Sequence, residues 1–461
     1  MTLTILMAGY IFTVDRMVNH EVAYGIGLFV IGLAVMMACR RTLPMQVENA
    51  ALWMVILVFL SSYCVKLFLI VVSPESPVVL GMVPRVGLGE FDYPLLIIDV
   101  LLLTAAGITA FSVAVLAVPA FVAYPGLVPI PNADRVGRRS LIALLVVALI
   151  LSLVSGWVSY RFDIGLMGSE IRAILPYRLR GIVFYLRNYF LTGLLLLTVY
   201  LAYRRSYRGL AWIAIGLLVL NGVADLAIRS SKASILAPLL YLAFLIIASG
   251  VKIRVRHVVL TVAISVPLLI LLPYFNTLRT FRLSGQGVWE SIASAAVSAD
   301  FHPVELLLRG FTWVIYRLPG VDILTAILGH HASPVGDQWF EIFSRPNGIA
   351  GYLTNDVFLT PVSHPHLAAP GYFGWWYLLL GVPGVVLGGA SLGLFVRIAW
   401  PLTLKLATHT AVLTRVFVLM LLFTALTEGT VDSMLKMFLA MLFTVLTLEG
   451  FIRMAVRFNH R

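Results

Sequence analysis

The sequence predicts an all-α, polytopic membrane protein, with one bundle of about twelve membrane-spanning helices formed by residues 1–461. Two observations support this prediction. Hydrophobic residues make up 61% of the 461 residues and charged residues only 12%, which is too little polar surface for an aqueous fold of this size. Apolar runs such as residues 51–72 and 141–160 are also long enough to cross a bilayer.

Most of the predicted spans follow one another through short connections. The first lacks the basic start and the small-residue cleavage site of a signal peptide, so we expect it to remain in the mature chain. The spans are expected at residues 3–14, 21–38, 50–72, 94–121, 140–160, 182–203, 209–228, 232–250, 258–275, 371–396, 409–427 and 433–451.

A long segment, residues 276–370, interrupts this pattern. It is moderately polar, rich in Arg and His, and lies between apolar helices. From residue 288 to 317, apolar and polar residues alternate at helical spacing, which predicts one or two amphipathic helices at the membrane surface, with Arg317 directed inward. Because function concentrates in loops held by a rigid scaffold, we expect this insert to take part in the chemistry.

Basic residues predict the orientation of the bundle. Clusters of Arg and Lys occupy alternate short loops, and the positive-inside rule assigns these loops to the cytoplasm. Both termini are then cytoplasmic, and the segment 276–370 lies outside. Much of the net charge of +12 therefore serves topology, and nucleic acid is not an expected partner.

The two cysteines, Cys39 and Cys64, are expected at opposite depths of the membrane. This placement argues against a disulfide and against a metal site, and packing roles are expected for both. No metal and no other cofactor is expected.

The predicted outer face carries an unexpected excess of arginine between residues 161 and 187. Positive-inside insertion disfavours cations on that side. The arginines could snorkel or pair with acids, or they could bind an anion such as phosphate or pyrophosphate, whose oxygens a planar guanidinium contacts in pairs. Their grouping favours the anion. The arginines are Arg161, Arg172, Arg178, Arg180 and Arg187.

The sequence AIRSSKASIL places Arg229 and Lys232 at the outer mouth of two predicted helices, with two serines between them. Free amides at a helix start, a capping serine and a cation together favour an anion. An ordinary capped hairpin with one snorkelling cation would have the same residues.

Two pairs of residues are candidates for acid–base work. Glu428 and Asp432 lie four residues apart, so a continuous helix would put both on one face, where one could accept a proton. They could instead pair with the outer arginines, and Asp432 could begin a helix. His364 and His366, in a Pro-rich segment, suit hydrogen bonding to sugar hydroxyls or phosphate better than metal binding.

Lys66, Asp99 and Asp225 are expected within the bilayer, where an ionisable group is costly unless it is paired. Such residues are either functional or members of structural ion pairs. Three scattered charges are few for the proton relay of a pump, which argues against a transporter.

Three passages resemble the Wzy-type oligosaccharide repeat-unit polymerases, which include the O-antigen and enterobacterial common antigen polymerases. They cover about the second half of the chain, and the sequence has Lys232 where relatives usually carry Arg, so a point-charge contact replaces a bidentate one. The passages are RSSKASIL, APGYFGWWYLLLGVPGVVLGG and TEGTVDSMLKMFLAML.

The resemblance implies a GT-C-like, inverting and metal-independent glycosyltransferase of the bacterial inner membrane. It would transfer a growing glycan from undecaprenyl pyrophosphate to the non-reducing end of an incoming lipid-linked repeat, at the periplasmic face. Glu428, His364 or His366 would deprotonate the acceptor hydroxyl. A chain-length regulator is a further candidate partner. The residues implied in pyrophosphate binding are Arg172, Arg178, Arg180, Arg187, Arg229, Lys232, Arg279, Arg282 and Arg317.

Three alternatives stay open. An O-antigen ligase would transfer the finished glycan to lipid A core and shares the basic outer turn. A lipid-linked oligosaccharide flippase predicts cations that line a path through the bundle instead of gathering at one face. A scaffolding protein leaves the arginine excess without a purpose.

Overall fold

In the computed structural model the regular elements of the described residues are all helices, some of them joined by short turns, and no strand occurs among those residues. Seven of the described helices are long and apolar enough to cross a membrane, so the protein is a multi-pass membrane protein. The described residues are 47–66, 93–118, 136–162, 179–229, 233–250, 284–298, 304–310, 320–330, 334–344, 348–357, 370–429 and 431–458, together with positions 164, 266, 270, 274, 277–278, 281 and 302.

The predicted helical class is confirmed, and from residue 93 onward most described helices begin and end close to the predicted spans. The predicted spans 3–14 and 21–38 lie outside the described residues, as does most of 258–275. The total of twelve spans and the GT-C-like arrangement therefore stay predictions.

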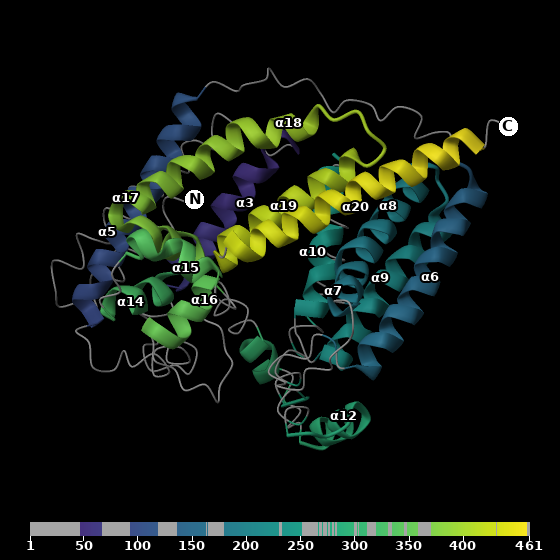
Figure 1. The fold of residues 1–461 in the computed structure, drawn as a ribbon, viewed down its shortest axis with the longest axis horizontal. Coiled ribbons are helices and arrows are strands. Elements are labelled where there is room, and N and C mark those ends of the chain that lie inside the picture. The colour runs from purple at the N-terminus through teal and green to yellow at the C-terminus, as the bar shows by residue number, and fades with distance from the viewer. Residues whose placement is uncertain are drawn as a thin grey trace. The chain divides into compact units, whose positions relative to one another are not determined.

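The chain divides into two compact units, and we describe each by itself (Figure 1). Unit 1 comprises Met1–Pro125, Thr312–Leu402 and Leu421–Leu435, and unit 2 comprises Gly126–Phe311, Thr403–Met420 and Lys436–Arg461. Helices α18 (Trp400–Leu404), α19 (Ala411–Glu428) and α20 (Val431–Phe458) contribute residues to both. The prediction of one membrane domain with an insert at 276–370 is not decided by this division.

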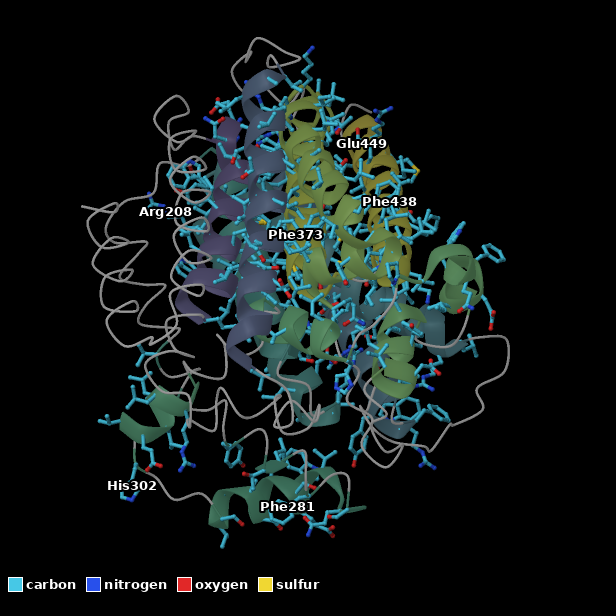
Figure 2. The ribbon with its side chains drawn as sticks, turned by 90° about the vertical axis from the view of Figure 1, so that its left-hand side faces the viewer. Arg208, Phe281, His302, Phe373, Phe438 and Glu449 are labelled. Carbon is cyan, nitrogen blue, oxygen red and sulfur yellow. The ribbon has the colours of Figure 1, made fainter. Side chains whose placement is uncertain are left out.

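Unit 1 is built on the packing of two long helices, α5 and α17, against each other. A Cβ on Gly389 would lie 2.0 Å from the carbonyl oxygen of Gly107, so the two backbones touch where both residues are glycine. Phe373 lies in the core, where its ring stacks on that of Phe59 at 5.1 Å (Figure 2). Its elements are η1 (Val47–Asn49), α3 (Ala50–Phe59), η2 (Leu60–Val65), α5 (Tyr93–Ala117), α14 (Val321–Gly329), η8 (Gly336–Gln338), α15 (Trp339–Ser344), α16 (Gly348–Tyr352), η9 (Leu353–Val357), α17 (Gly371–Leu394) and η10 (Phe395–Ala399).

Helix α17 is broken at Gly381, which has φ 67° and ψ −147°. The hydroxyl of Tyr372 donates to the carbonyl of Gly388 at 2.9 Å, although these residues would stand about 24 Å apart in a straight helix. The two halves therefore fold back toward each other. The predicted span 371–396 is thus two helical segments, because glycine tolerates this backbone geometry and Pro383 lacks an N–H.

The second half of the predicted insert packs onto the first half of α17. Ile327, Ile349 and Leu353 are buried in one cluster with Trp375 and Leu378. The backbone N–H of Val335 donates to the carbonyl of Leu378 at 2.6 Å, close to the break. This part of the insert therefore completes the core of unit 1 and supplies a partner for a carbonyl near the break.

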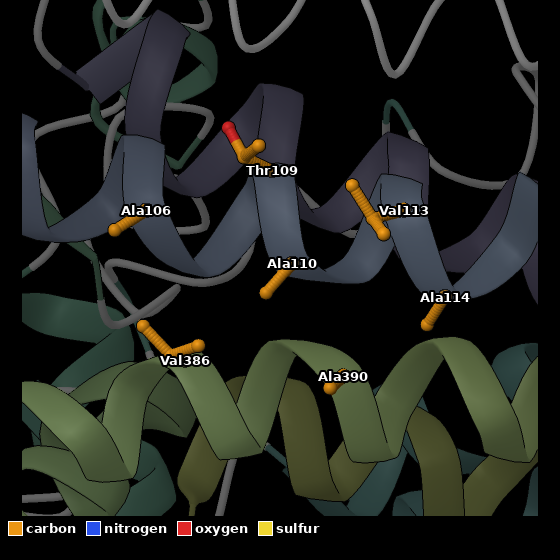
Figure 3. Close-up of a pocket in the computed structure, with 7 residues that line it drawn as sticks. All are labelled: Ala106, Thr109, Ala110, Val113, Ala114, Val386 and Ala390. Carbon is orange, nitrogen blue, oxygen red and sulfur yellow. The ribbon is translucent and has the colours of Figure 1, made fainter. Parts of the chain in front are cut away.

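An apolar groove of about 520 Å³ lies between α5 and α17 (Figure 3). No ionisable side chain lines it, so we do not consider it for chemistry. The lining residues are Ala106, Thr109, Ala110, Val113, Ala114, Val386 and Ala390.

Unit 2 is a group of helices in which α6, α8 and α9 each pack against the other two. Arg205, after α8, donates from Nε to the carbonyl of Val136, just before α6, at 3.3 Å, so these two chain segments lie at the same end. Leu186–Phe190 form a π-helical turn, a feature that often marks functional sites. The elements are α6 (Arg138–Arg161), α7 (Leu179–Tyr185), η7 (Leu186–Phe190), α8 (Leu191–Arg204), α9 (Arg208–Arg229), α10 (Ala233–Ala248) and α12 (Val288–Val297).

Helix α12 begins the predicted amphipathic region, and residues 304–310 are helical as well. The carboxylate of Glu290 accepts the N–H of Gly287 at 3.1 Å, which caps the helix start. Trp289 is 76% exposed, whereas Ser291 and Ala295 are buried. The helices of this region are confirmed, and their position at the membrane surface stays a prediction.

Candidate functional site

A cluster of buried charges lies in unit 2 where α6, η7 and α9 meet. Arg187 comes from the π-helical turn, and Asp225 and Arg229 lie one turn apart on α9. All three are buried. Two of the predicted phosphate-binding arginines are therefore side by side, around an acid that the sequence identified only as an intramembrane charge.

Arg187 is held on three sides. Its side chain is 1% exposed, and Nε donates to Asp225 Oδ1. Nη1 approaches the carbonyl of Ser152 at 3.3 Å and the hydroxyl of Ser155 at 3.5 Å. A Cβ on Gly156 would lie 2.7 Å from the same Nη1, so the missing side chain of this glycine leaves the space that Arg187 occupies.

Arg229 is held less completely. Its Nε lies 3.5 Å from Asp225 Oδ1, and Nη1 donates to Asn188 Oδ1 at 2.8 Å. The guanidinium carbon lies 5.2 Å from the ring centre of Phe184, within reach of a cation–π contact. Nη2 is buried and has no hydrogen-bond partner in the described part of the chain.

Two polar side chains extend the cluster along the bundle. The hydroxyl of Ser152 donates to Asn221 Oδ1 at 2.5 Å, and Asn221 Nδ2 donates to the carbonyl of Leu217 at 2.8 Å. These contacts fix α6 against α9 beside the ion pairs. Asp225 and Arg187 therefore lie beside a hydrogen-bonded contact between two packed helices and not on a loop.

The charges of this cluster do not balance. Two guanidinium groups share one carboxylate, so the three residues together carry an excess positive charge. A buried cation that lacks a full set of partners is costly in a low-dielectric environment, and an oxyanion would satisfy both the charge and the open donor. The arrangement can thus bind an anion such as phosphate.

The other predicted site residues are not brought to this cluster by any described contact. Arg180 is exposed in the first turn of α7. Glu428 is exposed and ends α19, and the following Gly429 approaches Gly371 at the start of α17 so closely that a Cβ would lie 2.1 Å from its carbonyl oxygen. The predicted residues outside the described part are Arg172, Arg178, Lys232, Arg279, Arg282, Arg317, His364 and His366.

Glu428 and Asp432 do not share one helix. Gly429 has φ 63° and ends α19, and Asp432 belongs to the first turn of α20. The expectation that both carboxylates lie on one face required a continuous helix, and this condition is not met. The alternative position of Asp432, near a helix start, agrees with the structure.

Sequence reasoning missed a second buried polar group in unit 2. Glu449 on α20 accepts hydrogen bonds from Thr410 and Arg453, and lies 3.2 Å from His409 Nδ1. The fully buried Arg415 donates to the carbonyls of Thr403 and Leu404. The available signal was the presence of Arg415 and Glu449 inside predicted spans, where charges are rare.

No group of three or more His, Cys, Asp or Glu side chains among the described residues is placed to hold a metal ion. Comparison of the chain with protein-family models, with curated proteins and with solved structures gave no match. The function must therefore be argued from the residues and their geometry.

Proposed function

We propose that this protein polymerises lipid-linked oligosaccharide repeat units at the outer face of the bacterial inner membrane, with both termini in the cytoplasm. The observation that carries the proposal is the buried, net-positive cluster in which Nη2 of Arg229 has no hydrogen-bond partner among the described residues. A second source of support is the resemblance of three passages to the Wzy-type polymerases. Nothing in this cluster is specific to one sugar.

The proposed reaction is a glycosyl transfer with inversion. The bond between the anomeric carbon of the growing glycan and its undecaprenyl pyrophosphate breaks, and a bond to a hydroxyl of the incoming repeat forms. The hydroxyl proton passes to a general base, for which Glu428, His364 and His366 are the candidates. The negative charge that develops on the leaving pyrophosphate is stabilised by arginine, which does not require a metal ion.

Burial gives arginine an advantage in this role. A guanidinium that is already desolvated and fixed needs little reorganisation when charge develops on the leaving group. Arg229 meets these conditions, because it is 5% exposed and is restrained by Asp225, Asn188 and Phe184. The exposed Arg180, the predicted Arg172 and Arg178, and Lys232 would supply further positive charge along the path of the donor.

The test uses a strain that lacks this gene, with surface polysaccharide separated by gel electrophoresis. Loss of the ladder, with a single capped repeat remaining on the lipopolysaccharide, supports a polymerase. Intact lipid-linked polymer without surface glycan would instead identify a ligase, and repeats retained on the cytoplasmic leaflet would identify a flippase.

Complementation then connects the activity to the cluster. We expect wild-type protein and Arg453→Ala to restore the ladder, because the Arg453 side chain is 61% exposed and belongs to a different polar group. Arg229→Ala, Arg180→Ala, Lys232→Ala and Glu428→Ala should each insert into the membrane and fail to restore it. Full restoration by Arg229→Ala would contradict the proposal.

A further inference from the structure

The two arginines that share Asp225 differ in the donors that they have left. Arg187 uses Nε and Nη1 on three acceptors within the protein. Arg229 uses Nη1 on Asn188 and keeps Nη2 without a hydrogen-bond partner among the described residues. The sequence predicted both arginines as phosphate ligands, whereas in the structure they differ in how many of their N–H donors are already used within the protein.

We infer that Arg229 is the residue of this cluster that binds a phosphate oxyanion, and that Asp225, Arg187 and Asn188 are positioning residues. The inference rests on the proposed function, since the phosphate would belong to the lipid-linked glycan. Phosphate binding can nevertheless be measured by itself, without polymerisation.

The position of Asp225 gives the physical reason. Two guanidinium groups repel each other in a low-dielectric environment, and a carboxylate between them offsets this repulsion. Arg187 Nε and Arg229 Nε both approach the same oxygen, Oδ1. One acid thereby fixes the location of both cations, and the hydrogen bonds of Arg187 to α6 fix the acid.

Asn188 and Phe184 fix the orientation of the Arg229 plane. Asn188 accepts from Nη1, and the Phe184 ring packs near the guanidinium at 5.2 Å. A guanidinium binds oxyanions through the N–H groups in its plane. The open donor of Arg229 therefore points in a direction that its neighbours determine.

Access to this donor requires a side chain to move, because Nη2 is buried. Phe184 is the described neighbour best suited to do so, since it is 41% exposed and extends from the short helix α7.

The first experiment makes the same substitution at both arginines. Purified full-length protein in detergent is titrated with inorganic pyrophosphate, and Kd is compared for wild type, Arg187→Lys and Arg229→Lys. Lysine keeps the charge and can still pair with Asp225, but it lacks the planar donor pair. We expect Arg229→Lys to weaken binding about ten-fold or more and Arg187→Lys by no more than about three-fold.

Equal losses at the two positions, or a larger loss at Arg187, would overturn the assignment, as would a wild-type protein that does not bind pyrophosphate. A second arm replaces pyrophosphate with a detergent-dispersed polyprenyl pyrophosphate. The difference between the two lysine variants should appear in both arms, because the phosphate is common to them. Equal affinities of the two lysine variants in both arms would contradict the inference.

Asp225 could either compete with the ligand for the arginines or position Arg229, and the two roles predict opposite changes in the affinity of Asp225→Asn for pyrophosphate. If Asp225 only competes with the ligand for the arginines, Asp225→Asn removes the competitor and tightens pyrophosphate binding. If Asp225 positions Arg229, the same variant weakens binding several-fold in spite of the added net positive charge, and Asp225→Glu recovers part of the loss. Tighter binding by Asp225→Asn would exclude the positioning role.

Asp225→Asn removes the one carboxylate that the described residues place beside the two buried guanidinium groups, so its thermal unfolding is measured beside the titration. Asn188→Ala provides a second variant that changes no charge and removes the Nη1 contact, together with the hydrogen bond from Asn188 Nδ2 to the carbonyl of Phe184 at 2.8 Å. We expect a loss of about three- to ten-fold in affinity, with a smaller fall in Tm than in Asp225→Asn. Unchanged affinity in Asn188→Ala would contradict the positioning of Arg229 by this residue.

These measurements separate the inference from the proposed function. If pyrophosphate binding depends on Arg229 and the deletion strain still makes full-length surface glycan, the polymerase is wrong and the anion site stands. If the deletion strain loses its ladder and the two lysine variants bind alike, the polymerase stands and the assignment of Arg229 is wrong.

Discussion

Glu449 on α20 accepts hydrogen bonds from two groups of Thr410 and from Arg453 (its place on the helix is marked in Figure 2). Thr410 is buried and immediately precedes α19, whereas the Arg453 side chain is 61% exposed. A buried N–H at a helix start depends on its acceptor, because water cannot replace it. An exposed arginine exchanges its acceptor for water at little cost.

We therefore expect Glu449→Ala to lower the free energy of unfolding by about 3 kcal/mol, since it leaves buried partners uncompensated. Arg453→Ala removes a contact to the same carboxylate and should cost less than about 1 kcal/mol. Denaturant unfolding of both variants in detergent micelles measures the difference. Similar losses in the two variants would show that the buried contacts of Glu449 do not dominate.

At the same residue scale, the sequence predicted which arginines to consider but not their partners. Arg187 and Arg229 were identified because cations are rare on the predicted outer side. The contact of Arg187 with Asp225 depends on the rotation of α9 against η7, which composition does not reveal. The contact of Arg229 with Asp225 is different, because the two residues lie four positions apart on α9 and this spacing could have indicated it. The role of Gly156 could not be predicted either, because it depends on the packing of the Arg187 side chain against this glycine in the folded protein.

Helix α17 shows what a single backbone position contributes at the scale of an element. Gly381 has φ 67°, and a Cβ there would also lie 3.3 Å from Pro334. Alanine is strained in this conformation, so we expect Gly381→Ala to lower the free energy of unfolding by about 1–3 kcal/mol.

The matched control is Gly216→Ala on α9, where an added Cβ meets no atom within 4 Å. Alanine favours a helix interior over glycine by about 1 kcal/mol, so this variant should be neutral or slightly stabilising. Thermal unfolding of both proteins in the same detergent gives the comparison. A stable Gly381→Ala protein would mean that α17 can straighten, which would contradict the fold-back geometry.

The elements that the sequence predicted well are those with a long, uniform apolar pattern. Helices α6 and α9, and the continuous run of α7, η7 and α8, agree closely with their predicted spans, because bilayer thickness sets the length of an apolar helix. The break in α17 was missed, since the residues on both sides of Gly381 are equally apolar and hydropathy does not report backbone direction. The end of α19 was predicted, because the expected span 409–427 stops one residue before Glu428, where α19 ends.

At the scale of the whole molecule, the ends of the unit 2 helices carry different residues. Arg205 contacts the carbonyl of Val136, so the end of α8 and the start of α6 lie together, and the turn that joins α8 to α9 is at this end as well. Arg229 terminates α9 at its other end. A helix of the length of α6, 24 residues, spans about 36 Å and reaches both membrane interfaces.

The positive-inside rule then predicts that the end of unit 2 with Arg138, Arg204 and Arg208 faces the cytoplasm and that the Arg229 end faces outward. Two exposed glycines give matched probes, because an added side chain meets no atom within 4 Å at Gly181 or at Gly209. In a protein with Cys39 and Cys64 replaced by serine, Gly181→Cys should react with a membrane-impermeant maleimide in intact spheroplasts. Gly209→Cys should react only after lysis, and the reverse pattern would place the arginine cluster on the cytoplasmic side, where no periplasmic donor could reach it.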